Sequence, residues 1–197
     1  MNYLGHLYFS GDDYSLMLAN LYGDFVKGKD YSYLPKIVQE GVLLHRNIDD
    51  YVDHHPHVTS LRLKLFKDLP KIAGIAIDLY FDHLLAKQWS QYHNQNLFEY
   101  IDCFFEYALN DTNLCFKENK FKYPDSFVNL LKVIHKHDFM KQYISLDGVK
   151  MASKGLSKRI SFDNNLGQAS EVFLVYEKEI NAAFDEYMLD AKHNFRI

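Results

Sequence analysis

Cysteine is scarce in this chain, and the short motifs of several enzyme classes are absent from it. The 197 residues include two cysteines, Cys103 and Cys115, which form no C-x-x-C pair. A disulfide framework and a cysteine-bound structural zinc site are therefore not expected. The chain also lacks a Gly-rich phosphate loop, G-x-S-x-G and H-E-x-x-H. The absence of Glu-x-x-His argues against a di-iron carboxylate bundle.

Long apolar runs and an excess of basic charge are missing as well. No apolar stretch approaches the length of a membrane span, and the opening residues, MNYLGHLYFSGDD, lack the basic region of a signal peptide. The formal net charge is -4, which argues against bulk binding of nucleic acid. We therefore expect a cytoplasmic protein that binds neither a membrane nor a nucleic acid.

The residues that are present indicate a helical globular protein. Hydrophobic residues make up 48% of the chain and aromatic residues 16%, which is enough for one core. Apolar residues recur at three- and four-residue spacing between the prolines. We predict an all-α, single-domain helical bundle over residues 1–197, with an exposed loop at 111–123. The expected helices cover residues 14–27, 35–53, 56–67, 70–92, 96–110, 124–144, 146–157 and 163–191, and residues 2–9 are expected to form one more short turn.

Histidines and acids gather within apolar helical segments, where charges are costly unless they are paired or bind metal. His45 and Asp49 are four residues apart and share one face of a helix. Asp78 and Asp82 have the same spacing in a later helix, and His83 follows directly. Mixed imidazole and carboxylate ligands suit Mn²⁺, Mg²⁺, Fe²⁺ or Zn²⁺. The alternative interpretation is a set of buried ion pairs in a helical scaffold without catalytic activity.

Four stretches of the chain form a specific combination: MNYLGHL at 1–7, NLYGDFVKG at 20–28, HRNID at 45–49 and DLYFDHLL at 78–85. Their order and spacing resemble the acyl carrier protein phosphodiesterase family, and weaker similarity continues over nearly the whole chain. The resemblance implies an all-helical, HD-domain-like fold, distantly related to the HD phosphohydrolases. It also implies Mn²⁺-dependent hydrolysis of holo-acyl carrier protein to apo-acyl carrier protein and 4′-phosphopantetheine.

This reaction requires a nucleophile, and no serine or cysteine with an adjacent base is evident. Water activated by the metal ion is therefore expected to attack the phosphodiester. Asp24 is expected to be a further ligand or the general base, while His83 and His6 are candidate proton donors to the leaving oxygen. Arg46 is a candidate for holding a phosphate oxygen. The expected metal ligands are His45, Asp49, Asp78 and Asp82.

Acyl carrier proteins are small and acidic, so a basic docking surface is expected even on a chain of negative net charge. Lys150, Lys154 and Lys158 recur every four residues, and Arg159 follows. We predict that these four residues contact the carrier protein, the alternative being an ordinary solvated helix face. The alternative function is that of an HD-like phosphohydrolase acting on a nucleotide or another phosphoester.

Overall fold

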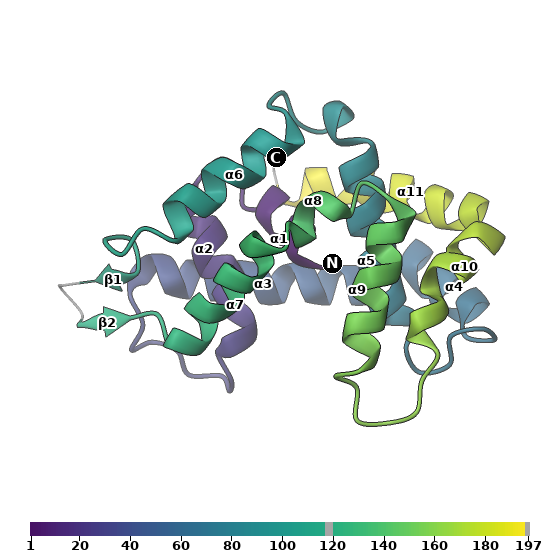
Figure 1. The fold of residues 1–197 in the computed structure, drawn as a ribbon, viewed down its shortest axis with the longest axis horizontal. Coiled ribbons are helices and arrows are strands. Elements are labelled where there is room, and N and C mark those ends of the chain that lie inside the picture. Colours follow the sequence, from purple (N-terminus) through teal and green to yellow (C-terminus); the bar gives the residue numbers. More distant parts are fainter. Residues whose placement is uncertain (117–119, 196–197) are drawn as a thin grey trace.

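The computed structural model describes residues 1–116 and 120–195, and α-helices form most of it (Figure 1). The prediction of an all-α fold is confirmed. Residues 117–119 of the predicted loop and 196–197 of the predicted domain lie outside the described residues. The helices are α1 (Tyr3–Tyr8), α2 (Tyr14–Tyr22), α3 (Lys36–His54), α4 (Pro56–Leu65), α5 (Ala73–Lys87), α6 (Leu97–Ala108), α7 (Asp125–Lys136), α8 (Phe139–Gln142), α9 (Leu146–Ser157), α10 (Ala169–Val175) and α11 (Glu177–Phe195).

Shorter elements join these helices. The 3₁₀ helices are η1 (Gly23–Phe25), η2 (Trp89–Gln91) and η3 (Leu166–Gln168). Within the predicted loop, β1 (Cys115–Phe116) pairs with β2 (Phe121–Lys122) as a small antiparallel hairpin that the sequence pattern did not predict. The hairpin lies at one end of the long axis of the molecule (Figure 1).

Short polar residues and prolines determine where several helices begin. The Asp13 side chain accepts hydrogen bonds from the backbone N–H groups of Ser15 and Leu16 at the start of α2. The Ser145 hydroxyl caps α9 in a similar way. These caps satisfy N–H groups that have no partner within the helix. Pro56 lies in the first turn of α4, where its missing N–H removes no helical hydrogen bond.

Two of the predicted helices are divided into two α-helices, and the predicted helices at 14–27 and 70–92 are shorter than expected. Residues 124–144 form α7 and α8 instead of one helix, because Asp138 adopts a left-handed backbone conformation with φ of 50°. Such a conformation cannot continue a right-handed helix. Residues 163–191 divide into α10 and α11 at Tyr176. The predicted helix at 14–27 gives way to the tighter turn η1.

Helix α5 runs through the interior of the fold and buries residues on nearly all of its sides, including Leu79, Tyr80 and Phe81. A helix that is apolar all round belongs in a protein core. Helix α1 packs against α5, while α2 packs closely against α3. A Cβ atom at Gly41 would lie 2.4 Å from the backbone of Ala19, so the close approach of α2 and α3 requires glycine there.

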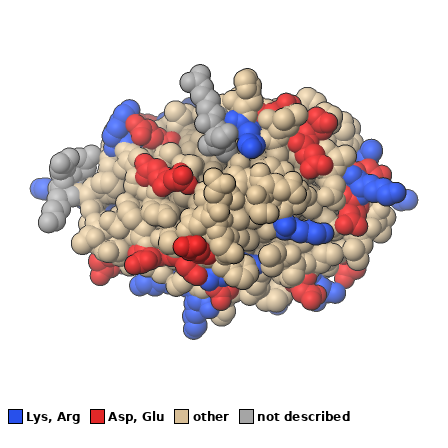
Figure 2. All heavy atoms as spheres, turned by 90° about the horizontal axis from the view of Figure 1, so that it is seen from above, with Lys and Arg blue, Asp and Glu red and all other residues tan. Residues whose placement is uncertain are grey.

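The N-terminus lies near the middle of the molecule, with α7 on one side of it and α9 on the other (Figure 1). Helix α3 runs along the long axis behind it. On the face drawn in Figure 2, basic and acidic side chains are interspersed among uncharged ones. Among the described residues, no helix is both long enough and apolar enough to span a membrane.

Candidate metal centre

An open cavity of about 350 Å³ lies where α1, η1, α3 and α5 meet. Three of its histidine and aspartate residues come from α3, and the tertiary fold brings the others from separate elements. The histidines and aspartates of the lining are His6 from α1, Asp24 from η1, His45, Asp49 and Asp53 from α3, and Asp78 from α5.

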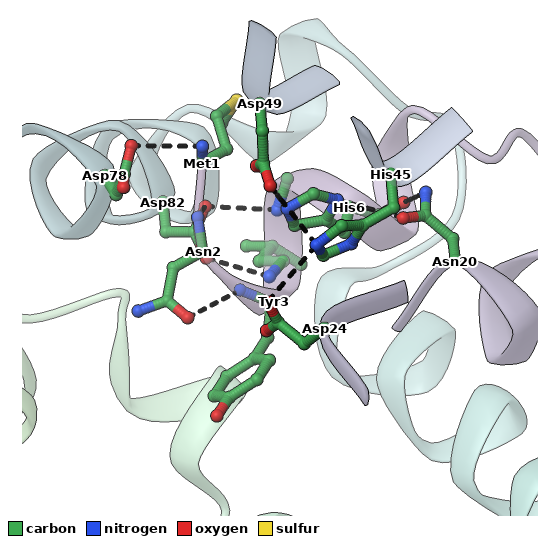
Figure 3. A network of polar contacts seen from close by, with 12 residues as sticks. Met1, Asn2, Tyr3, His6, Asn20, Asp24, His45, Asp49, Asp78 and Asp82 are labelled. Carbon is green, nitrogen blue, oxygen red and sulfur yellow. Dashed lines mark hydrogen bonds and ion pairs between the residues drawn. The ribbon is translucent and has the colours of Figure 1, made fainter. Parts of the chain in front are cut away.

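Two imidazoles and two carboxylates converge in this cavity (Figure 3). Nε2 of His6 lies 3.3 Å from Oδ1 of Asp49, and Nε2 of His45 lies 3.2 Å from Oδ2 of the same carboxylate. Oδ1 of Asp24 lies 3.3 Å from that His45 nitrogen. Both histidines are buried, whereas the side chains of Asp49 and Asp24 are 46% and 67% exposed. The centre therefore opens to solvent on its carboxylate side.

Neighbouring residues fix the orientation of both rings. Nδ1 of His6 and Oδ1 of Asn20 lie 2.9 Å apart in a hydrogen bond, with the imidazole as donor when Nδ1 carries the proton. The Asn20 amide group donates to the His6 carbonyl and to the Ser10 hydroxyl, which fixes the direction of its oxygen. The ring of His45 packs directly on Gly23, where a Cβ atom would lie 2.4 Å from Cγ of that ring. Gly23 is therefore required by the position of His45.

The protonation states of the four side chains depend on one another. Burial lowers the pKa of His6 despite its hydrogen bond with Asp49. Burial also opposes the charged form of His45, yet its contacts with Asp24 and Asp49 outweigh this effect and raise its pKa to about 9. The hydrogen bond from His45 lowers the pKa of Asp24. The two imidazoles likewise hold the pKa of Asp49 well below its usual range, against the effect of its partial burial.

The donor set fits a divalent metal ion. One ligand atom each from His6, His45 and Asp49 lie within 4.8 Å of one another, and Asp24 adds a second carboxylate beside them. Imidazole with carboxylate is a ligand combination suited to Mn²⁺, Fe²⁺ and Zn²⁺. The hydrogen bond between the second ring nitrogen of His6 and Asn20 is the outer contact that metal-binding histidines usually make.

Asp82, a predicted metal ligand, has a different set of partners. The backbone N–H groups of Asn2, Leu4 and Gly5 donate to its carboxylate at 3.2, 2.8 and 3.1 Å. The side chain is completely buried, and burial raises its pKa to about 7 although these hydrogen bonds and the N-terminal amine oppose the shift. Asp82 does not line the cavity. These contacts anchor α1 to α5, and the role of Asp82 as a metal ligand stays a prediction.

Asp78 and His83 also have partners within the protein. Asp78 lines the cavity, but its Oδ1 lies 3.0 Å from the α-amino nitrogen of Met1 (Figure 3). Nδ1 of His83 lies 2.7 Å from the carbonyl oxygen of Tyr143, and the ring is buried away from the cavity lining. Of the two predicted proton donors, His6 reaches the centre and His83 does not.

Arg46, predicted to hold a phosphate oxygen, is bonded to the backbone of its own protein. One guanidinium nitrogen donates to the carbonyl oxygens of Val26 and Gly28 at 3.0 and 2.7 Å, and the group lies over the ring of Tyr31. Val26 and Gly28 lie just after η1, and η1 carries Asp24. The contacts of Arg46 therefore hold the chain next to Asp24. Arg46 supports the chain beside η1 in this way, and its contact with a phosphate oxygen stays a prediction.

The four predicted docking residues separate into two groups. Nζ of Lys150 lies 2.9 Å from a carboxylate oxygen of Glu171, so this lysine is engaged in an ion pair. Lys154, Lys158 and Arg159 are exposed and line a second hollow at the end of α9. The predicted helical repeat reaches only to Lys154, because α9 ends at residue 157.

Two residues at the centre were not assigned a role from the sequence. Asn20 was noted only for sharing a helical face with Asp24, and its contact with His6 depends on the packing of α1 against α2. Tyr3 lines the cavity beside Asp24 (Figure 3). Burial raises the pKa of Tyr3, assisted by Asp24 and opposed by the guanidinium of Arg159. The motif MNYLGHL contained Tyr3, but no spacing rule predicts contacts between such distant segments.

Fold and site together define an all-helical protein with an imidazole–carboxylate centre in an open cavity. The sequence model of the family described as acyl carrier protein phosphodiesterase matches residues 1–191. The chain belongs to this family, and the resemblance noted from its motifs is confirmed.

Curated relatives agree with this assignment. The acyl carrier protein phosphodiesterase of Salmonella agona (strain SL483) is 28% identical over 159 residues, which cover 81% of this chain and 79% of the relative. The proteins of that name from Salmonella dublin and Salmonella newport (strain SL254) show the same identity and coverage. No solved structure matches the chain significantly, so the HD-like arrangement stays a prediction.

Proposed function

We propose that this chain is a metal-dependent phosphodiesterase that hydrolyses holo-acyl carrier protein to apo-acyl carrier protein and 4′-phosphopantetheine. The observation that carries the proposal is the convergence of His6, His45 and Asp49 on one point in an open cavity. The family description and the names of the relatives supply the substrate.

The reaction adds water to phosphorus and breaks the bond between phosphorus and the serine oxygen of the carrier protein. The serine oxygen leaves with a proton, and the phosphoryl group remains on the pantetheine arm. A bound divalent ion supplies Lewis-acid stabilisation of the phosphoryl charge and lowers the pKa of water. We assign His6, His45 and Asp49 to hold this ion, with Asp24 as a further ligand or the base that accepts the proton from water.

We propose Mn²⁺ as the ion, with Mg²⁺ or Fe²⁺ as substitutes, because a mixed nitrogen and oxygen donor set accommodates all three. Asn20 and Gly23 position the two rings, and Arg46 holds the chain that carries Asp24. These residues act through the ligands and do not touch the substrate.

The decisive experiment incubates the purified protein with holo-acyl carrier protein and Mn²⁺, and follows conversion to the apo form by intact mass. We expect conversion with Mn²⁺ and none after chelation with EDTA. His45→Gln and Asp49→Asn should abolish both conversion and Mn²⁺ binding, the latter followed by the electron paramagnetic resonance of free Mn²⁺. His54→Gln, at the exposed end of α3, is the matched control.

Each outcome separates one hypothesis from another. Conversion that persists in EDTA would contradict metal dependence. Hydrolysis of a nucleotide, such as a guanosine polyphosphate, without release of 4′-phosphopantetheine would replace the proposed substrate with the alternative phosphoester. Absence of both activities together with absence of Mn²⁺ binding would favour the non-catalytic scaffold.

The proposal places the reaction in the cytoplasm, with the carrier protein as the partner and no nucleic acid involved. The two cysteines, Cys103 and Cys115, are free thiols, which agrees with a reducing compartment.

A further inference from the structure

A second hollow of about 370 Å³ adjoins the metal-centre cavity. It lies between α7 and α9, and we call it the arm groove. Asn2, Tyr3 and Leu156 line both hollows. The two hollows are therefore neighbours that share these three residues.

The arm groove is apolar inside and basic at its mouth. Leu130, Val133 and Ile134 of α7 form one wall, and Met151 of α9 contributes to the other. The charged groups on the lining are all cationic: Lys154, Lys158 and Arg159. The guanidinium of Arg159 lies beside the Tyr3 hydroxyl, at the junction with the cavity. A ligand suited to these walls has an apolar body and an anionic group near the junction.

The 4′-phosphopantetheine released in the proposed reaction has an apolar group close to its anionic phosphate. Its phosphate is joined through one CH₂ group to a carbon that carries two methyl groups, and amides follow. A phosphoryl group at the metal centre therefore places two methyl groups immediately next to it, on the side where the shared wall leads into the groove. Burial of these methyl groups is favourable in proportion to their apolar area. Arg159, at the junction, complements the phosphate charge.

We propose that the arm groove binds the pantetheine arm of the substrate while its phosphodiester lies at the metal centre. This inference rests on the proposed function and specifies which surface recognises the substrate. An acyl group, which lies at the far end of the arm beyond its amides, is too distant from the phosphate to be the first group in the groove. The acidic surface of the carrier protein complements the basic residues at the mouth of the groove. It does not complement the apolar walls inside, so the carrier surface is not the group that fills the groove.

Gly155 provides a direct test, because it lines the groove and a Cβ atom there would meet no other atom within 4 Å. Gly155→Trp should fill the groove without a clash within the protein. Gly155→Ala is the matched control, since it leaves the groove open and favours the helix. Val133→Trp, on the opposite wall and 44% exposed, is a second filling variant should Gly155→Trp fail to fold.

The measurements are KM for holo-acyl carrier protein and inhibition by three separate probes: free 4′-phosphopantetheine, inorganic phosphate and apo-acyl carrier protein. We expect Gly155→Trp to raise KM and the inhibition constant of 4′-phosphopantetheine by about tenfold or more. Inhibition by inorganic phosphate and by apo-acyl carrier protein should not change, and neither should Mn²⁺ binding. Gly155→Ala should behave as the wild type does.

Two results would overturn the inference. One is a filled groove with unchanged KM and unchanged inhibition by 4′-phosphopantetheine. The other is weaker inhibition by apo-acyl carrier protein alone, which would assign the groove to the carrier surface. Failure of the proposed function can be told apart from failure of the groove inference, because the wild-type protein would then release no 4′-phosphopantetheine. Calorimetric binding of 4′-phosphopantetheine to the Mn²⁺-loaded wild type and Gly155→Trp proteins would still test the groove in that case.

Discussion

The rings of His6 and His45 stack with their centroids 4.2 Å apart and their planes inclined by 16°. Two imidazolium ions at this separation would repel each other strongly. Burial lowers the pKa of His6, and the charge of the neighbouring His45 adds to this effect, whereas the contacts with Asp24 and Asp49 raise the pKa of His45. In the proposed function, a divalent ion binds the same nitrogen and oxygen atoms and displaces the proton that His45 carries.

Binding of Mn²⁺ near neutral pH should therefore release about one proton per protein, mainly from His45. Calorimetric titrations in buffers with different ionisation enthalpies measure this number. His45→Gln should release no proton and should bind the ion weakly. Binding to the wild type with no proton release would contradict the assignment of His45 as a ligand.

The stability of the metal-free protein should depend on pH through the same histidine. Its folded pKa of about 9 exceeds the ordinary value of 6.5, so the folded protein retains a proton that the unfolded chain loses in this window. The stabilisation is complete below pH 6.5 and declines as pH rises toward 9. Urea unfolding in EDTA across this range should show the decline. The decline should be smaller in His45→Gln, and an equal slope in both proteins would refute this origin.

Gly23→Ala should disrupt the centre more than it disrupts the fold. The added methyl group meets the His45 ring at 2.4 Å, so the ring must move away from Asp24 and Asp49. We expect at least about a tenfold loss of Mn²⁺ affinity, as seen when supporting contacts of a metal ligand are removed. Gly74→Ala is the control, since its Cβ atom would make only ordinary contacts, the nearest at 3.7 Å. Equal Mn²⁺ affinity in the two variants would contradict the steric argument.

Asp82→Asn should reduce stability and loosen α1. The amide retains one acceptor oxygen for the three backbone N–H groups that the carboxylate now serves, and an unsatisfied buried donor costs about 1–3 kcal/mol. Urea unfolding measures the loss, with exposed Asp163→Asn as the control. Because His6 is part of α1, Mn²⁺ affinity should fall as well. Full stability in Asp82→Asn would show that the hydrogen bonds to α1 are not required.

Lys158→Glu should raise KM for holo-acyl carrier protein several-fold and change kcat much less, because exposed charges mainly accelerate encounter. Lys158 is preferred to Lys150 for this test, since Lys150 already pairs with Glu171. The effect should be largest at low ionic strength, where screening is weakest. Lys64→Glu, on α4, is the control. Identical KM values at low salt would place the docking surface elsewhere.

The sequence was most informative where the chemistry depends on one helix. His45 and Asp49 could be paired from their spacing alone, because residues four apart always share a helical face. The same rule paired Asp78 with Asp82, yet their partners come from the N-terminal segment. The carbonyl partners of Arg46 could not be predicted either, because they depend on the path of the loop after η1. The division between α7 and α8 at Asp138 was not predicted, because an aspartate in the sequence does not by itself indicate a left-handed backbone conformation.

Helix α1 has six residues, too few for an isolated helix to persist in water. It supplies His6 to the centre and is anchored by its backbone contacts with Asp82. Detachment of this short segment would dismantle the centre while the rest of the core stayed folded, as in the local opening events that hydrogen exchange detects. Catalytic lifetime would then be governed by the opening rate of α1, and metal ions would prolong it by binding only the closed form.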